Sequence, residues 1–434
     1  MSKLNLIPIG TLFDLEKGSL QSSKCTEGKY TFITAAEEWK THNEYSHECE
    51  ALIFAAAASG SLGRTHYIND KFITSDLCFI LTPKDSKKYP INLKFYHFVF
   101  NSLKDEIVKN TKSGTSKESI NQSNLRNYEI QYFEINKQNL WIDKLVNTNS
   151  IKEDLELELS HGQSLLKQLK QTILQEAIEG KLTAKWRAKN PDIGTAKELL
   201  EQIKIEKEKL IKEKKIKASK PLALINEDEI PFNIPQNWEW CRFGTIIESA
   251  NNGLYKKASF YTDDGIPSLR MYNIQNGEIV YKNIRCVELS FEEFEQYKLI
   301  TNDLLLNRVN SKELVGKTAI IRENLKKIVY ESMNMRIRLI NPLMSSYINK
   351  YILSAGTKEY FSNISKVASG QVSINQNQVY SLKVPLPPLE EQKEIVTTIE
   401  KLFAICDELE CEINQNKITV ENLMATVLKE AFEQ

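Results

Sequence analysis

The chain has 434 residues, 57 basic and 57 acidic side chains, 41% hydrophobic and 26% charged residues. At about 100 to 200 residues per domain this length predicts two or three domains, and the zero net charge argues against a general nucleic-acid coat. No apolar run approaches the roughly 18 residues of a membrane span, and no export signal is recognisable. The seven cysteines form no CxxC pair. These features predict a cytoplasmic protein with reduced thiols.

The first region, residues 1–146, reads as a mixture of strands and one helix. Short apolar or alternating runs such as KYTFIT, EALIFAAAAS and KFITSDLCFIL are separated by Gly, Asn and Asp, which favours strands joined by turns. Between them, residues 93–110 have helical periodicity. A domain of mixed strands and helices is expected here.

From about Asn147 the pattern changes to apolar residues at spacings of three and four. This periodicity predicts a long amphipathic helix, with an interruption near Gly162 and an end at Gly180. A lysine-rich helical run follows and stops before Pro221. Residues 147–220 are therefore interpreted as a central long helix with a basic helical linker.

Residues 221–388 repeat the mixed pattern, and residues 389–434 form a second long amphipathic helix. Two helices with one apolar stripe each must bury it, and each is the other's simplest partner. The predicted fold class is thus mixed α+β, with two domains joined by long helices that pair as an antiparallel coiled coil. A pseudo-twofold relation between the halves is expected.

The two halves share short phrases at one constant offset. The tetrad SINQ occurs at 119–122 and at 373–376, and the same offset aligns LKQTILQEAIE (169–179) with LMATVLKEAFE (423–433). This indicates one duplication of a large unit rather than a solenoid. The phrases around SINQ have two readings, which both stay open: a turn entering a strand, or a loop whose hydroxyls and amides bind a phosphate backbone.

Motifs for catalysis are missing from the sequence. GKT at 316–318 resembles a phosphate loop only in part, because Ser311 stands where glycine is required. His42, His47 and Cys49 lack an evident fourth metal ligand, so a solvated loop is favoured over zinc. We predict no catalytic residue, no metal and no cofactor in this chain.

Loops of the second half carry the side chains that nucleic-acid recognition uses. NNGLYKK (251–257), LRMYN (269–273) and LNRVNSK (306–312) combine Arg, Lys, Asn and Tyr. Arginine can read guanine and asparagine can read adenine, whereas lysine is suited to phosphate. An ordinary solvated surface is the alternative for each single loop.

Together, this organisation and four segments resemble the specificity (S) subunit of type I restriction-modification systems. The segments are EDEIPFNIPQNWEWCRFGTI (227–246), ASGQVSINQNQVYSLKVPLPPLEEQKEIV (368–396), LLKQLKQTILQEAIEGKLTAKWR (165–187) and LLEQIKIEKEKLIKEKKIKASKPL (199–222). The resemblance implies two target-recognition domains, each reading one half of a bipartite DNA site, with the helices setting the spacing. It also implies two methyltransferase (modification) subunits that use S-adenosylmethionine and two restriction subunits with ATP- and Mg-dependent translocase and nuclease activity. The catalysis would reside in those partners.

Candidate DNA-binding residues follow from these loops. Phosphate contacts are expected from the lysines and base contacts from the arginines and asparagines of the second domain. The candidates are Arg64, Lys112, Ser113, Thr115 and Lys117 in the first domain, and Lys256, Lys257, Arg270, Asn307, Arg308, Asn310, Lys312, Lys366, Ser369 and Gln371 in the second. Three alternatives remain: a structural coiled-coil scaffold, a fused restriction-methylation enzyme, and the recognition subunit of another DNA-methylation defence system.

Overall fold

The computed structural model describes residues 5–57, 60–114, 118–218, 221–322, 327–368 and 371–433, with backbone only for 366–368 and 432–433. The chain divides into two compact units: Met1–Gly162 with Glu412–Gln434, and Gln163–Cys411. Within the described ranges, no helix is both long and apolar enough to cross a membrane.

Unit 1 combines a mixed β-sheet with short helices and the beginning of a long helix. Its strands are β1 (Leu6–Pro8), β2 (Phe13–Lys17), β3 (Tyr30–Ile33), β4 (Lys40–His42), β5 (His47–Ala55), β6 (Thr65–Thr74), β7 (Cys78–Pro83), β8 (Lys112–Ser113), β9 (Ser119–Ile120) and β10 (Glu129–Gln131). Its helices are α1 (Ile9–Leu12), η1 (Ser22–Lys24, a 3-10 turn), α2 (Leu93–Ser102), α3 (Lys104–Thr111), α4 (Gln122–Asn127) and the first part of α5 (Ile135–Ile178).

The central sheet of unit 1 has six strands in the order β2-β7-β5-β6-β3-β4. All neighbours are antiparallel except β3 and β6, which are parallel. The continuous apolar run in β5 is buried from Ala51 to Ala55, so both faces of that strand are covered. The expected helix at 93–110 is broken at Leu103 into α2 and α3.

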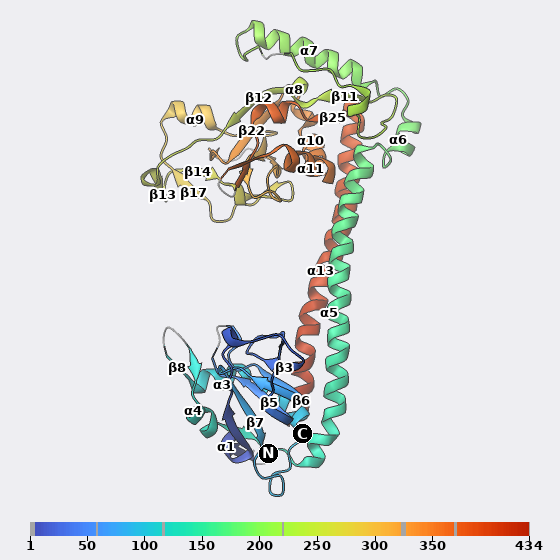
Figure 1. Ribbon diagram of the computed structural model, residues 1–434. Helices are drawn as coiled ribbons and strands as arrows, with labels where there is room; N and C mark the ends of the chain where they lie inside the picture. The colour runs from blue at the N-terminus through green and yellow to red at the C-terminus, as the bar shows by residue number, and fades with distance from the viewer. Residues whose placement is uncertain are drawn as a thin grey trace. The chain divides into compact units, whose positions relative to one another are not determined.

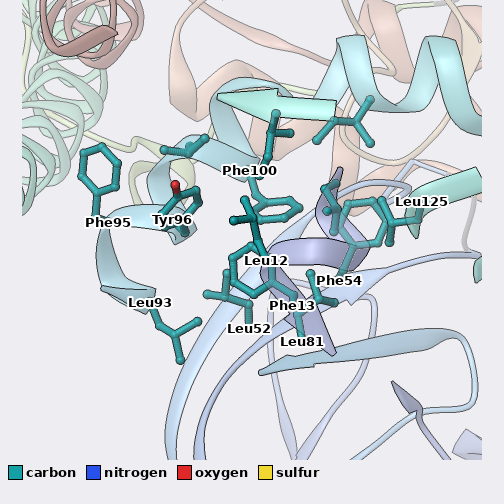
Figure 2. Packing of buried hydrophobic residues seen from close by; sticks show 14 of the residues in the cluster. Leu12, Phe13, Leu52, Phe54, Leu81, Leu93, Phe95, Tyr96, Phe100 and Leu125 are labelled. Carbon is teal, nitrogen blue, oxygen red and sulfur yellow. The ribbon is translucent and has the colours of Figure 1, made fainter. Parts of the chain in front are cut away.

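One face of this sheet packs on α2 through a core of aromatic and aliphatic side chains. Figure 2 shows Phe13, Phe54 and Phe100 in this core, where the Phe100 ring contacts each of the other two edge to face. The same core receives Trp141 and Leu145 of α5. That packing explains why α5 begins at Ile135 and not near Asn147, because its first turns belong to the domain core.

Unit 2 contains more and shorter strands. Its strands are β11 (Glu239–Arg242), β12 (Ile247–Asn252), β13 (Tyr261–Thr262), β14 (Ile266–Leu269), β15 (Ile274–Gln275), β16 (Glu278–Ile279), β17 (Arg285–Val287), β18 (Leu304–Asn307), β19 (Val309–Asn310), β20 (Thr318–Ile320), β21 (Val329–Tyr330), β22 (Asn334–Leu339), β23 (Lys366–Ala368), β24 (Gln371–Ser373) and β25 (Lys383–Leu386). Its helices are α6 (Ala184–Lys189), α7 (Ala196–Lys212), η2 (Glu227–Glu229), α8 (Phe243–Ile246), η3 (Ala258–Phe260), η4 (Met271–Asn273), α9 (Phe291–Tyr297), η5 (Pro342–Met344), α10 (Ser345–Ile352), α11 (Ala355–Ile364), α12 (Gln376–Tyr380) and most of α13 (Leu389–Glu433).

Two four-stranded sheets form the body of unit 2, in the orders β12-β22-β18-β20 and β13-β17-β14-β21. Unit 2 also contains a separate three-stranded sheet in the order β19-β24-β23. The mixed α+β fold class predicted from the sequence is confirmed in both units.

The repeated SINQ phrase has the same structural role in both units. Ile120 and Ile374 are buried, and the next residue caps a short helix: Asn121 accepts from the Asn124 amide at 2.8 Å, and Asn375 from the Gln378 amide at 3.0 Å. The following glutamines reach a strand backbone, since Gln122 Nε2 donates to Leu15 O and Gln376 Nε2 to Ala250 O, both at 2.5 Å. In both units the phrase therefore joins the end of a strand to the start of a helix and hydrogen-bonds this junction to another strand.

Both long helices have a buried glutamine in their first turn. Gln138 Nε2 donates to Phe133 O at 2.6 Å in unit 1, and Gln392 Nε2 donates to Pro387 O at 2.9 Å in unit 2. Each side chain thus binds the carbonyl five residues upstream and fixes where the chain turns into the helix. The duplication extends from sequence phrases to individual hydrogen bonds.

The helices α5 and α13 pair along their lengths (Figure 1). In unit 1 Lys144 Nζ lies 3.0 Å from Glu430, and in unit 2 Lys170 Nζ lies 2.8 Å from both Asp407 and Glu410. Residues further along α5 pair with residues earlier in α13, so the two helices are antiparallel. α5 continues through Gly162 without the interruption expected there, and the ideal Cβ position at Gly162 lies 3.5 Å from Ile413.

Candidate nucleic-acid interface

A short segment of unit 2, residues 331–334 at the turn from β21 into β22, connects three of the loops singled out in the sequence. The Glu331 amide donates to Leu269 O at 3.0 Å and the Ser332 amide to Leu254 O at 2.8 Å. The Arg308 amide donates to Met333 O at 2.9 Å. We call residues 251–257, 269–273, 308–312 and 331–334 the loop face.

Gly253 makes this close assembly possible. A Cβ atom at this position would lie 2.3 Å from Glu331 O, well inside van der Waals contact. Only glycine lets two backbones approach so closely. The NNGLYKK loop is therefore held against the 331–334 turn by its main chain.

Asparagines build the floor of the loop face. Asn307 is fully buried, and its Nδ2 donates to Met333 O at 3.0 Å and to Asn334 Oδ1 at 3.2 Å. Asn310 Nδ2 donates to Asn307 Oδ1 at 2.7 Å. Asn307 thus lies below the surface, where its amide holds the Met333 backbone and the Asn334 side chain.

Arg270 lies at the end of β14 on this face. Its Nε forms an ion pair with Glu331 Oε1 at 2.8 Å, and its guanidinium carbon lies 5.8 Å from the Tyr272 ring centre and 5.9 Å from that of Tyr261. The Glu331 carboxylate raises the pKa of Arg270. The side chain is therefore charged and held in place before any ligand arrives.

The other cations of the second domain are presented differently. Arg308 is half-buried and donates to Ser332 O at 3.2 Å, and burial lowers its pKa. Lys256 forms an ion pair with Glu293 at 2.5 Å, whereas Lys257 and Lys312 are exposed. Exposed lysines of this kind suit the phosphate backbone.

Three candidates of the hairpin at 366–373 lie at the limit of the description. Gln371 is exposed at the start of β24, paired with Ala368. The side chain of Lys366 and the whole of Ser369 lie outside the described residues. Because Val309 pairs with Ser373, the hairpin is attached to the loop face through β19.

In unit 1 the candidates gather at the end of β5. The Gly63 amide donates to Ala55 O and the Ile120 amide to Ala56 O, both at 2.8 Å, which brings the turn before Arg64 next to the β8–β9 hairpin. Arg64 lies 3.8 Å from Glu37. The hairpin side chains make local contacts, Lys112 with Glu118 at 2.7 Å and Ser113 with Ser119 O at 3.2 Å; Thr115 and Lys117 lie outside the described residues.

Sequence reasoning missed the residues that connect the loops. Glu331, Asn334 and Tyr261 contact predicted residues, but they come from a strand turn and a strand without a basic cluster. The local sequence ESMN (331–334) does not indicate that Glu331 pairs with an arginine about 60 residues earlier in the chain. Within the described ranges no group of three or more His, Cys, Asp or Glu side chains could hold a metal.

Fold and surfaces define a duplicated protein: two mixed domains, each continued by a long helix that pairs with the other, and each with a polar, cation-bearing loop surface. The chain belongs to the family of the type I restriction modification DNA specificity domain, whose model matches residues 1–161 and 235–419. The resemblance found in the sequence is thereby confirmed.

Individual relatives agree with this membership. The chain is 32% identical over 256 residues to the type I restriction enzyme EcoEI specificity subunit of Escherichia coli, covering 58% of this chain and 42% of that protein. It is 27% identical over 355 residues to the EcoKI specificity subunit of Escherichia coli K12, covering 79% of this chain and 66% of that protein. The chain thus spans less than two thirds of the length of these relatives.

One solved structure shares the fold over the whole chain. It comes from work on the structural basis underlying complex assembly and conformational transition of the type I R-M system, and it matches this chain with a TM-score of 0.70. The match covers 100% of this chain and 99% of the other at 13% identity.

Proposed function

We propose that this chain is the DNA-reading subunit of a type I restriction-modification complex. Each half would read one half of a bipartite DNA site, and the paired helices would set the spacing between the half-sites. The single observation that supports this most strongly is the family match in both halves, each half carrying its own loop surface. Two readers on one chain are what a split site requires.

The proposed contacts divide by chemistry. Lys256, Lys257, Lys312 and Lys366 would hold phosphates, and Arg270, Arg308 and Asn310 would face bases, with Ser369 and Gln371 beside them. In the first domain the proposed contacts are Arg64, Lys112, Ser113, Thr115 and Lys117. Asn307, also a base-contact candidate from the sequence, is buried and bonds Met333 O and Asn334 Oδ1, so we propose that it supports the loop that carries the contacts.

Catalysis would come from partner chains. We propose that two methyltransferase subunits, using S-adenosylmethionine to methylate adenine, and two restriction subunits, using ATP and Mg, assemble on this chain in the cytoplasm. The described residues offer no metal cluster of three or more ligands. A recognition subunit of another DNA-methylation defence system would use the same surfaces with different partners.

Selection from random double-stranded DNA tests the proposal directly. The purified full-length chain should enrich two short half-sites at one fixed gap. A pool that stays random would exclude sequence recognition and favour a structural scaffold. Enrichment of a single continuous site would remove the bipartite part of the proposal.

A further inference from the structure

Arg270 differs from Arg308, the other arginine of the loop face, because a carboxylate lies at one edge of its guanidinium. Glu331 Oε1 lies 2.8 Å from Arg270 Nε, with side-chain exposures of 12% for Glu331 and 31% for Arg270. An ion pair this sheltered is screened less by solvent than a surface pair. The ion pair therefore keeps the guanidinium beside Glu331 while leaving it partly exposed.

The tyrosines on either side complete this arrangement. Tyr261 and Tyr272 lie 5.9 and 5.8 Å from the guanidinium carbon, and Tyr272 is itself fixed because its hydroxyl donates to Asn283 O at 2.8 Å. Burial, followed by the neighbouring Glu331 carboxylate, raises the pKa of Tyr261 to about 12. Glu331 thus contacts both Arg270 and the ring beside it.

The Nε edge that Glu331 uses carries one of the five guanidinium donors. The four others are on the two Nη atoms. Two parallel bonds from an arginine to O6 and N7 of guanine are the commonest specific contact in the major groove. An arginine held through Nε keeps its Nη pair for this bidentate contact.

We propose that Arg270 reads a guanine in the half-site of the second domain and that Glu331 is the positioning residue that makes this contact selective. The inference rests on the proposed DNA-reading function and deepens it to one base and one supporting residue. It assigns a specificity role to an acidic residue on a surface that must approach polyanionic DNA.

The charge of Glu331 gives the proposal its test. Removing a carboxylate from a DNA-facing surface should leave non-specific affinity unchanged or raise it, because one source of repulsion is lost. If Glu331 positions Arg270, the same change should lower the preference for guanine. A residue that only stabilises the fold would not move these two quantities in opposite directions.

The experiment is selection from random double-stranded DNA with the full-length chain, followed by binding to the selected site and to single-base variants of it. Arg270→Ala should lose about 5- to 150-fold of discrimination at one guanine of one half-site. Arg270→Lys should keep non-specific affinity and lose that discrimination, because lysine cannot form the bidentate contact. Glu331→Gln should reduce discrimination at the same guanine by about 5-fold or more, with non-specific affinity unchanged or higher.

The matched control is Glu278→Gln, which alters a second Arg–Glu pair of unit 2, Arg322 with Glu278 at 2.8 Å, away from the loop face. It should leave the selected site unchanged. Full guanine preference in Glu331→Gln, or an equal loss at all positions with Arg270→Ala, would overturn the inference. If the wild-type chain selects no site at all, the proposed function itself fails, whatever the variants do.

Discussion

Single side chains on the loop face divide into tethered and exposed cations. Arg270 pairs with the Glu331 carboxylate, whereas Lys257 and Lys312 are exposed. A cation that is already held by an ion pair loses little further conformational freedom on binding, which favours selective contacts. An exposed lysine can adapt to any phosphate. Affinity and selectivity are therefore expected from different residues of one surface.

The exposed lysines predict the salt dependence of DNA binding. Each phosphate contact contributes about 0.9 to the slope of log affinity against log salt. Lys257→Ala and Lys312→Ala should each reduce that slope by about 1 on any sequence. Titrations at several salt concentrations measure the slope; Lys393→Ala, in a Glu390 pair on α13, is the control. An unchanged slope in both loop variants would remove these lysines from the interface.

Two histidines of the first domain, His66 and His97, predict a pH dependence of its stability. Burial lowers the pKa of His97 to about 4 and also lowers that of His66. Since the folded state disfavours the charged imidazole, stability is fully present above about pH 6.5 and is lost as pH falls toward 4. From about pH 7.5 to about pH 5, His97 should cost roughly 2 kcal/mol of the free energy of unfolding.

Urea unfolding at both pH values checks this. His97→Gln should flatten the dependence, whereas His161→Gln, at an exposed position on α5, should not change it. An identical pH response in His97→Gln would show that other groups cause it.

At the scale of elements, a buried carboxylate holds the start of α13 against two other segments. Glu391 is fully buried. It accepts hydrogen bonds from Thr183 at 2.7 Å, Trp238 at 2.9 Å and Asn237 at 3.4 Å, and it pairs with Arg187. The contact ties the segment after α5, which includes α6, and the entry to the second domain to one helix start.

Removing this carboxylate should be costly. Glu391→Ala leaves the half-buried Arg187 without its partner and the buried donors of Thr183 and Trp238 without their acceptor, and we expect a loss of about 3 to 5 kcal/mol in the free energy of unfolding. The adjacent Glu390 is exposed and pairs with Lys393 at the surface, so Glu390→Ala should change the free energy of unfolding by less than about 1 kcal/mol. Denaturant unfolding of the two variants compares neighbours on one helix; equal effects would contradict the assigned role of Glu391.

The elements that periodicity and repetition report were predictable, and those that depend on distant contacts were not. The mixed domains and the paired helices α5 and α13 follow from apolar spacing in the sequence. The start of α5 was placed too late because Trp141 and Leu145 pack into the domain core, which hides the helical face among strand residues. Likewise the burial of Asn307 depends on Asn334 and Met333, which no local pattern links to it.

At the scale of the whole molecule, the proposed spacing role of the helices gives a length prediction. Seven residues inserted into each helix, at the level where Gly162 faces Ile413, add about 10 Å and nearly preserve the facing stripes. At about 3.4 Å per base pair, the gap in the recognised site should grow by about three base pairs. DNA selection measures the gap between the half-sites. An unchanged gap would show that helix length does not set the spacing.

The place of insertion matters. Ile399 is fully buried and Glu400 pairs with Arg322, so residues added there would shift α13 against its own domain. Inserting the seven residues in α5 alone is the matched control, since it removes the facing partner and should weaken recognition without defining a new gap.

Modified-base mapping of the host genome, with the gene intact and deleted, tests the central claim most directly. The proposed function predicts that one split motif, two half-sites at a fixed gap, loses methylation on deletion and regains it when the gene is restored. If every methylated motif persists in the deletion strain, or if the lost motif is continuous, the chain is not the reader of a bipartite site.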